Sequence, residues 1–204
     1  MNAKKLSFLL LILVAVACTN RSTSSEQDEM RHWNNVLQQI NALLLENKAQ
    51  QTLDLAKQTL PEILESAEKN GTTDTLIYYA RKIFNACGNN YINTKQYKDG
   101  IDYMDSIGNH PLIREHCPHE LLSFKAGLNQ LYGNNPEAVR LAEDYLQLPV
   151  CTSANDFIRQ AEIISGVYMY SGNNLPKAIQ ILEKAIDVYP VSYTHLTLPT
   201  ILRV

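Results

Sequence analysis

The chain has 204 residues, of which 45% are hydrophobic and 19% are charged. This composition is ordinary for a soluble globular domain and argues against a chain dominated by disorder. The 18 Lys and Arg residues are balanced by 21 Asp and Glu residues. The chain therefore lacks the basic excess typical of nucleic-acid-binding proteins, and we expect no nucleic-acid partner.

The first 17 residues have the pattern of an export signal. Lys4 and Lys5 supply a positive start, and an apolar run of 12 residues then leads through small residues to Cys18. A run of that length is too short to cross about 30 Å of hydrocarbon as a helix, which takes about 20 residues. We therefore predict that residues 1–17 are a signal peptide, with a signal anchor as the alternative.

The letters AVAC at residues 15–18 resemble the lipobox of bacterial lipoproteins. The resemblance implies cleavage just before Cys18 and acylation of that cysteine, although Ala15 stands where Leu is commonest in the family. It implies a location at the bacterial cell envelope, with the protein held to a membrane by lipid and facing the periplasm or the cell surface. An ordinary secretory signal with an incidental cysteine is the alternative.

A tether and then helices are predicted after the signal. Residues 18–29 are rich in Ser and Thr and then acidic, without apolar periodicity, and are predicted to be a flexible tether. From Met30 the apolar residues recur at steps of three and four, which predicts a helix. Further along we predict helical hairpins. The clearest of them has a helix ending near Asn93, a break near Lys95 and a second helix starting at Tyr97.

Three of these hairpins carry large, small and aromatic residues at matching offsets, and in this they resemble the tetratricopeptide repeat. The matching residues are, hairpin by hairpin, Phe84, Cys87, Gly88, Tyr91, Gly100 and Met104; Leu122, Ala126, Gly133, Ala138 and Ala142; Ala161, Ile164, Ser165, Tyr168, Gly172, Ala178, Leu182, Ala185 and Pro190. The resemblance implies an all-α fold, an α-solenoid of three or four antiparallel helix hairpins over residues 30–190. The spacing of 38–39 residues exceeds the family's usual length of about 34, and residues 30–70 match only loosely. A related helical-hairpin solenoid therefore stays open.

One corner motif occurs twice, as YGNNPEA at residues 132–138 and SGNNLPKA at residues 171–178. Gly133 and Gly172 are predicted to take a positive φ at the end of a helix, and Pro136 and Pro176 to lie in the first turn of the next helix. The last hairpin has one residue inserted in its turn. Small side chains let paired helices cross closely. The expected contacts are Gly88 with Gly100, Ala126 with Ala138, and Ser165 with Ala178.

The resemblance also implies a concave groove, lined by the first helix of each hairpin, that holds a peptide or a helix of another protein. The family's groove positions fall by offset on Lys82, Asn85, Asn89, Glu120, Ser123, Arg159, Glu162, Met169 and Tyr170. Any of these residues could instead be ordinary solvated surface. Asn85 stands where the family's clamp for a terminal carboxylate needs a lysine, so that mode of binding is not predicted.

The residues that could carry chemistry are few. The stretch REHCPHE at residues 114–120 has His116, Cys117 and His119, but no second Cys/His cluster at metal spacing completes a zinc site. We predict a turn there, with Pro118 starting a helix and Glu120 in its first turn. The sequence has no phosphate-cradling loop and no recognisable catalytic pattern. We therefore predict no enzyme activity, no metal and no cofactor.

Three cysteines remain once Cys18 is lipidated. Cys87 occupies an apolar position and is predicted to be a small buried hydrophobe. Cys117 and Cys151 open and close the same hairpin, so a disulfide between them is conceivable in an exported protein. Its alternative is a pair of thiols too far apart to join.

The last residues break the helical pattern. VSYTHLTLPT, residues 191–200, resembles translated sequencing-adapter read-through, so residues 191–204 are interpreted as an artefactual tail on a truncated gene, with a disordered native tail as the alternative. Truncation would leave one face of the final helix bare. The residues of that face are Ile179, Leu182 and Ile186.

Three functional hypotheses follow. We favour a lipid-anchored envelope scaffold whose hairpins bind a protein or peptide partner. The alternative is the extracytoplasmic sensor or input region of a longer bacterial signalling protein, such as a histidine kinase or regulator. An enzyme on a helical scaffold would need paired acids or a nucleophile with its base, and the sequence offers only scattered charge.

Overall fold

The computed structural model describes residues 27–149 and 154–188. Within these ranges it contains nine helices and no strand, so the prediction of an all-α fold is confirmed. Eight of the helices pair into four hairpins, and a short helix links the second hairpin to the third. We call the first helix of each hairpin its A helix and the second its B helix.

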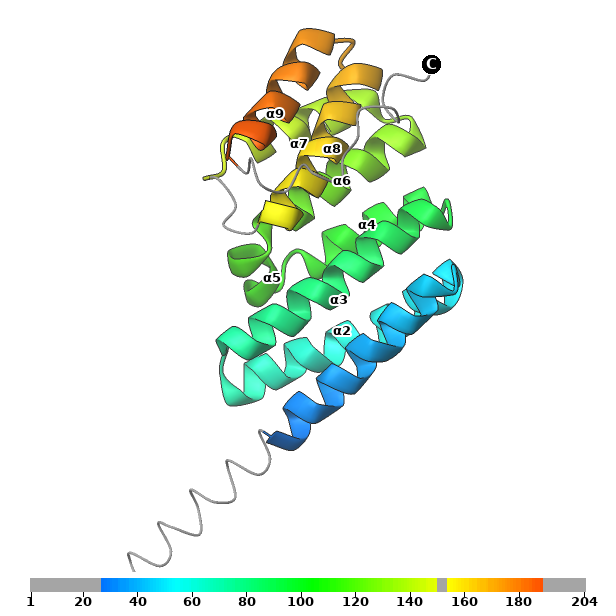
Figure 1. Ribbon diagram of the computed structural model, residues 1–204, viewed down its shortest axis with the longest axis vertical. Coiled ribbons are helices and arrows are strands. Elements are labelled where there is room, and N and C mark those ends of the chain that lie inside the picture. The colour runs from blue at the N-terminus through cyan, green and yellow to red at the C-terminus, as the bar shows by residue number, and fades with distance from the viewer. Residues whose placement is uncertain (1–26, 150–153, 189–204) are drawn as a thin grey trace, which may run out of the picture.

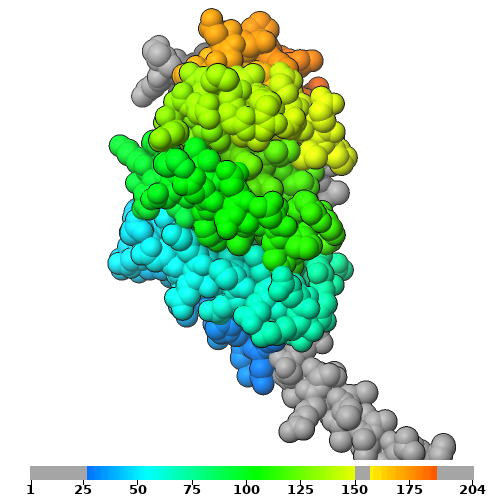
Figure 2. All heavy atoms as spheres, turned by 180° about the vertical axis from the view of Figure 1, so that it is seen from behind, coloured from blue at the N-terminus to red at the C-terminus, as the bar shows by residue number. Residues whose placement is uncertain are grey.

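The hairpins follow one another along the chain and along the long axis of the molecule (Figure 1). In chain order the helices are 27–45, α2 (Ala49–Asn70), α3 (Asp74–Asn93), α4 (Tyr97–Ile107), the linking α5 (Pro111–His116), α6 (Pro118–Tyr132), α7 (Asn135–Leu146), α8 (Ala154–Tyr170) and α9 (Leu175–Val188). Each B helix packs against the next A helix, because α2 contacts α3, α4 contacts α6 and α7 contacts α8. Figure 2 shows the same succession from behind.

The helix boundaries bear on two of the predictions. The helix break predicted near Lys95 is confirmed, since α3 ends at Asn93 and α4 begins at Tyr97. The tether, by contrast, was predicted to extend to Glu29, but the first helix already begins at residue 27. Glu29 accepts a hydrogen bond from the Ser66 hydroxyl at 3.0 Å, so this first turn is already held against α2.

All four hairpins turn in the same way, and this construction sets the register of the stack. A residue with positive φ stands two places before each B helix; these residues are Asn47 (55°), Lys95 (58°), Gly133 (94°) and Asn173 (45°). The backbone N–H of the following residue closes the corner on an A-helix carbonyl, a Schellman-type bond. These bonds are Lys48 to Leu43 at 2.9 Å, Gln96 to Tyr91 at 3.1 Å, Asn134 to Asn129 at 2.9 Å and Asn174 to Tyr168 at 2.9 Å.

The fourth corner is one residue longer than the others, as the sequence predicts, because its bond spans six residues instead of five. The insertion overturns one prediction. Gly133 does take a positive φ, but Gly172 does not, and Asn173 takes the left-handed conformation in its place. Asparagine tolerates that conformation better than most residues do. Pro136 and Pro176 lie in the first turns of their helices, as predicted.

A second position is shared by all four hairpins. It is the residue whose backbone N–H donates the first hydrogen bond of each B helix, and it carries a small side chain. The donors are Thr52, Gly100, Ala138 and Ala178, and all four residues are buried. On the A helices the corresponding small residues Gly88, Ala126 and Ser165 are buried as well. The first hairpin has Ile40 at that offset, which explains why residues 30–70 match the repeat only loosely.

The two helical glycines of the second hairpin make room for the third hairpin. A Cβ atom on Gly88 would lie 2.4 Å from the ring of Phe124 on α6, and one on Gly100 would lie 3.0 Å from both Leu128 and Tyr91. Each glycine therefore lies against bulky side chains, and the expected contact between Gly88 and Gly100 stays a prediction. α6 is the central helix, since it contributes Phe124 to one apolar core and Ala126 to the other.

We expect Gly88→Ala to lower the free energy of unfolding by about 1–3 kcal/mol, because the added methyl group overlaps a buried aromatic ring. The matched control is Gly166→Ala in α8, where the nearest atom to an added Cβ is Gln130 Oε1 at 3.9 Å. That control should keep or raise stability by up to about 1 kcal/mol, through better helix propensity. Urea unfolding measures both, and equal stabilities for the two variants would contradict this account of the α3–α6 contact.

Candidate partner-binding face

Three of the predicted groove residues lie together on α3. Lys82, Asn85 and Asn89 follow one another at steps of three and four, so they share one face of the helix, and each is half-buried. Lys82 Nζ lies 5.8 Å from the centre of the Tyr78 ring, and Asn89 Nδ2 donates to the Asn85 carbonyl at 2.6 Å. The face therefore presents one cation and two amides to a partner.

Four more of the predicted residues lie on α8. Arg159 and Glu162 are exposed in its first half, whereas Met169 is half-buried and Tyr170 is 70% exposed at its end. Although Glu162 is exposed, partial desolvation of its carboxyl group raises its pKa, and the charge of Arg159 acts in the opposite direction. The carboxylate of Glu162 thus lies where a partner's cation would lower its energy.

The two groove residues predicted on α6, Glu120 and Ser123, are not available to a partner, because both are buried. Glu120 Oε1 lies 3.1 Å from Nε of Arg81 on α3, and the Ser123 hydroxyl donates to the Glu120 carbonyl at 3.1 Å. Arg81 also donates to the His116 carbonyl at 2.5 Å. Arg81 is not among the predicted groove residues, although its charge next to the apolar positions of α3 is a signal that the sequence contains.

The stretch REHCPHE forms a helix start, as predicted: Pro118 is the first residue of α6 and Glu120 lies in its first turn. His119 Nε2 lies 2.6 Å from the Pro149 carbonyl oxygen, and its ring meets the ring of Tyr145 edge-on at 5.8 Å. Among the described residues, no three His, Cys, Asp or Glu side chains converge as a metal site would require.

The structure describes Cys87 and Cys117 but not Cys18 or Cys151, so it bears on only some of the cysteine predictions. Cys87 is fully buried, as predicted, and burial raises the pKa of its thiol to about 12, which keeps it protonated at neutral pH. Cys117 is buried, but Cys151 lies outside the described residues, so the disulfide stays a prediction. Cys18 and residues 191–204 also lie outside them.

A small pocket lies where α7, α8 and α9 meet near the start of α6. Its volume is about 30 Å³, which is more than a single water molecule needs. Its lining includes Tyr145, Phe157, Ile181 and Lys184.

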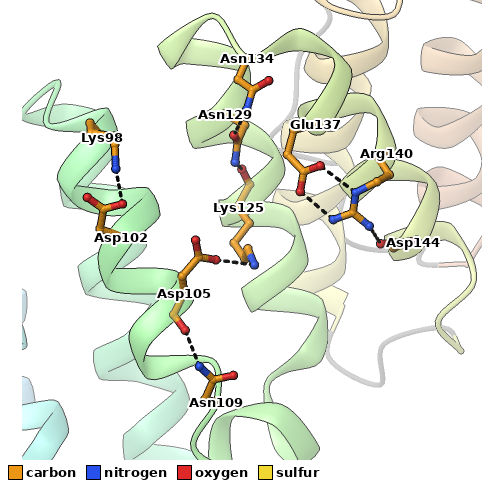
Figure 3. Close-up of polar contacts among 10 residues, drawn as sticks. All are labelled: Lys98, Asp102, Asp105, Asn109, Lys125, Asn129, Asn134, Glu137, Arg140 and Asp144. Carbon is orange, nitrogen blue, oxygen red and sulfur yellow. Dashed lines mark hydrogen bonds and ion pairs between the residues drawn. The ribbon is translucent and has the colours of Figure 1, made fainter.

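Several charged side chains on α4, α6 and α7 form ion pairs with one another (Figure 3). Lys125 on α6 pairs with Asp105 on α4 at 2.6 Å, and Arg140 on α7 pairs with Glu137 and Asp144, each at 2.6 Å. Exposed pairs of this kind contribute only about 0–1 kcal/mol each. These pairs therefore add little to the stability of the fold.

No family model, curated protein or solved structure matches this chain. None of the helices in the described ranges combines the length and the apolar character needed to cross a membrane.

We expect Glu120→Gln to lower the free energy of unfolding by about 2–3 kcal/mol, because the Arg81 guanidinium then loses the charge of its buried partner. The loss stays below that of a fully buried pair, since the Arg81 side chain is 29% exposed. Glu137→Gln, which breaks an exposed pair, is the control and should cost less than about 1 kcal/mol. Equal urea midpoints for the two variants would show that the α3–α6 ion pair contributes no more than a surface pair.

Proposed function

We propose that this protein is a scaffold that binds a polypeptide partner along the A-helix face of α3 and α8, and that lipid on Cys18 holds it at the bacterial cell envelope. The observation that carries the proposal is the run of accessible polar side chains on α3 and α8. Both helices pack against α6, whose own polar residues are used inside the fold.

The charges on this face also indicate which charges a partner would carry. Lys82 favours an acidic residue over α3, whereas Glu162, whose pKa is raised by burial, favours a basic residue over α8. The amides of Asn85 and Asn89 can donate to and accept from a partner's backbone or side chains. A segment with an acid at one end and a base at the other fits this arrangement.

A photo-crosslinking experiment tests the binding face. A crosslinking side chain placed at Asn85 or Asn89 should give discrete adducts in cells, and Lys82→Glu should reduce them at least tenfold, because it repels an acidic partner residue. The same probe at Asp102, among the paired charges of Figure 3, is the control and should give none. Adducts from Asp102 alone would contradict the assignment of the face.

A second experiment tests the anchor. Replacing Cys18 with Ala should move the protein from the membrane pellet to the soluble fraction, because no acyl chain can then be attached. Cys151→Ala removes a cysteine without touching the lipobox and should leave the protein in the pellet. Retention of the Cys18→Ala protein in the pellet would reject the lipid anchor.

The outer face of α9 favours a second candidate, the input region of a longer signalling protein. Leu175, Ile179 and Ile186 are 54%, 46% and 45% exposed there, and an input module passes its state on through such a contact. An intact genomic copy whose frame continues into a span of about 20 apolar residues would support this candidate. A stop codon after one or two further hairpins would reject it.

A further inference from the structure

The B helices have one side in common, which can be followed from hairpin to hairpin. It is counted from the small residue that donates the first backbone bond of each B helix. The positions one, four and eight places further on are spaced by three and four, so they lie on the same side of the helix. In chain order they are Leu53, Ala56 and Leu60; Ile101, Met104 and Gly108; Val139, Ala142 and Leu146; Ile179, Leu182 and Ile186. We call the last three, on α9, the end face.

In the first three hairpins this side is covered, and the cover comes from the next A helix. None of its nine residues there is exposed. A Cβ atom added to Gly108 of α4 would lie 2.9 Å from Leu121 of α6. Leu146 of α7 lines the small pocket together with Phe157 of α8. α2 packs against α3 in the same way.

The end face has no such cover among the described residues. Ile179 is 46% exposed and Ile186 is 45% exposed, and Leu182 is half-buried. Leu175, one turn before Ile179, is 54% exposed and extends the end face. Contiguous exposed apolar residues mark interaction sites. Because the same positions meet an A helix three times within this chain, we expect a helix on α9 as well.

A charged residue stands beside this side of each B helix, five places after the small residue. In the first three hairpins it meets a side chain of the following hairpin. Glu183 is the fourth member, and it is exposed and has no ion-pair partner within the described ranges. A cation on the occupant of the end face would complete the series. The three earlier contacts are Lys57 Nζ with the centre of the Tyr91 ring at 5.5 Å, Asp105 with Lys125 at 2.6 Å, and Glu143 with Lys177 at 2.5 Å.

The contact between α4 and α6 shows how one helix can meet both the apolar side and the acid. Three residues of α6 are spaced by four and three and lie against α4, with a lysine between two leucines (Figure 3 shows the lysine and its acid). The order of the contacts makes α6 antiparallel to α4. The contacts are Leu121 with Gly108, Lys125 with Asp105, and Leu128 with Gly100.

The same spacing can be transferred to α9, because its positions correspond to those of α4. An apolar residue of the occupant then lies against Ile186, a Lys or Arg four places later meets Glu183, and a second apolar residue three places further on lies against Ile179. Burial of the two apolar residues supplies affinity, and the ion pair with Glu183 fixes the register.

A second copy of this chain fits the end face less well. The first helix exposes polar residues on its outer side, namely Asn34, Gln38 and Asn41. Two α9 helices packed about a two-fold axis would bring their Glu183 carboxylates together, since Glu183 lies near the middle of the end face, and like charges repel. The sequence of residues 189–204 lacks the pattern as well, because its one Lys or Arg, Arg203, has Pro199 four places before it.

We propose that the end face of α9 binds an amphipathic helix of a partner protein, which takes the place of a further A helix. This helix runs antiparallel to α9 and carries apolar residues four places before and three places after a Lys or Arg that pairs with Glu183. The inference goes beyond the face of α3 and α8 and does not depend on it. It gives the outer face of α9, considered above as a contact of a signalling protein, a partner of stated chemistry.

Peptide binding to the full-length protein, measured by fluorescence anisotropy, tests this inference. The probe is a helical peptide as long as α6, with Leu, Lys and Leu at steps of four and three on a background of Ala and Gln. The matched peptide has Glu in place of Lys. The protein should bind the Lys peptide at least about fivefold more tightly than the Glu peptide, and Glu183→Lys should reverse this preference, because attraction and repulsion are exchanged.

Three further variants locate the peptide. Ile179→Asp and Ile186→Asp should each weaken the Lys peptide at least about tenfold, because each places a charge within the apolar contact. The control Asp54→Lys, at an exposed acid on α2, should change binding less than twofold. Thermal melts confirm that each variant is folded.

The other outcomes would overturn the inference in distinguishable ways. Equal binding of both peptides, or of neither, would reject the helix with a cation. Binding that survives both isoleucine variants but is lost with Lys82→Glu would reject the end face and leave the scaffold standing. Absence of crosslinks at Asn85, with the charge preference intact, would reject only the face of α3 and α8.

Two outcomes would assign the end face to another occupant. A dimer in sedimentation that is lost with Ile186→Asp, without peptide binding, would assign it to a second copy. An intact genomic copy that encodes the same spacing in a helix directly after α9 would make the chain its own occupant and overturn the partner protein.

Discussion

The stack depends on how the chain reverses at the end of each A helix. One residue takes a left-handed conformation, the next closes a bond onto an A-helix carbonyl, and four residues later a small side chain meets the neighbouring helix. Lys95 adopts this conformation although it is not glycine, which costs roughly 1 kcal/mol. The corner bond and the packing of both helices hold it there, so the fold tolerates different residues at the same conformational position.

The same constraint determines the interior. Because each B helix contacts the next A helix, α6 lies among α3, α4, α7 and α8 and has little surface left for solvent. The glycine at position 88 lets the ring of Phe124 approach α3, and the Arg81–Glu120 ion pair joins the same two helices at another point. A carboxylate buried in this way needs its partner's charge, so the pair ties the middle of the stack together.

The sequence predicts best those features that depend on nearby residues. The boundaries of α3 and α4, the cap at Gly133 and the prolines of α7 and α9 each follow from a few adjacent residues, and all are confirmed. The prediction of a positive φ at Gly172 is wrong because the residue inserted in the fourth corner moves the left-handed conformation one place along, to Asn173. The prediction that Glu120 and Ser123 line the groove is wrong for a different reason. Repeat offsets predict on which side of a helix a residue lies, but they do not predict which neighbouring helix covers that side.

The proposed binding role depends on which polar side chains the stack leaves accessible. On α4, α6 and α7 several charged side chains pair with one another, and a partner there would compete with those pairs. On α3, by contrast, Lys82 and the amides of Asn85 and Asn89 are accessible, and exposed apolar side chains, among them Leu45 and Tyr170, stand at the ends of other A helices. A partner that buries those apolar groups gains free energy from their removal from water. In the binding mode that we propose, apolar contacts would supply the affinity and the polar residues of α3 and α8 would select the partner.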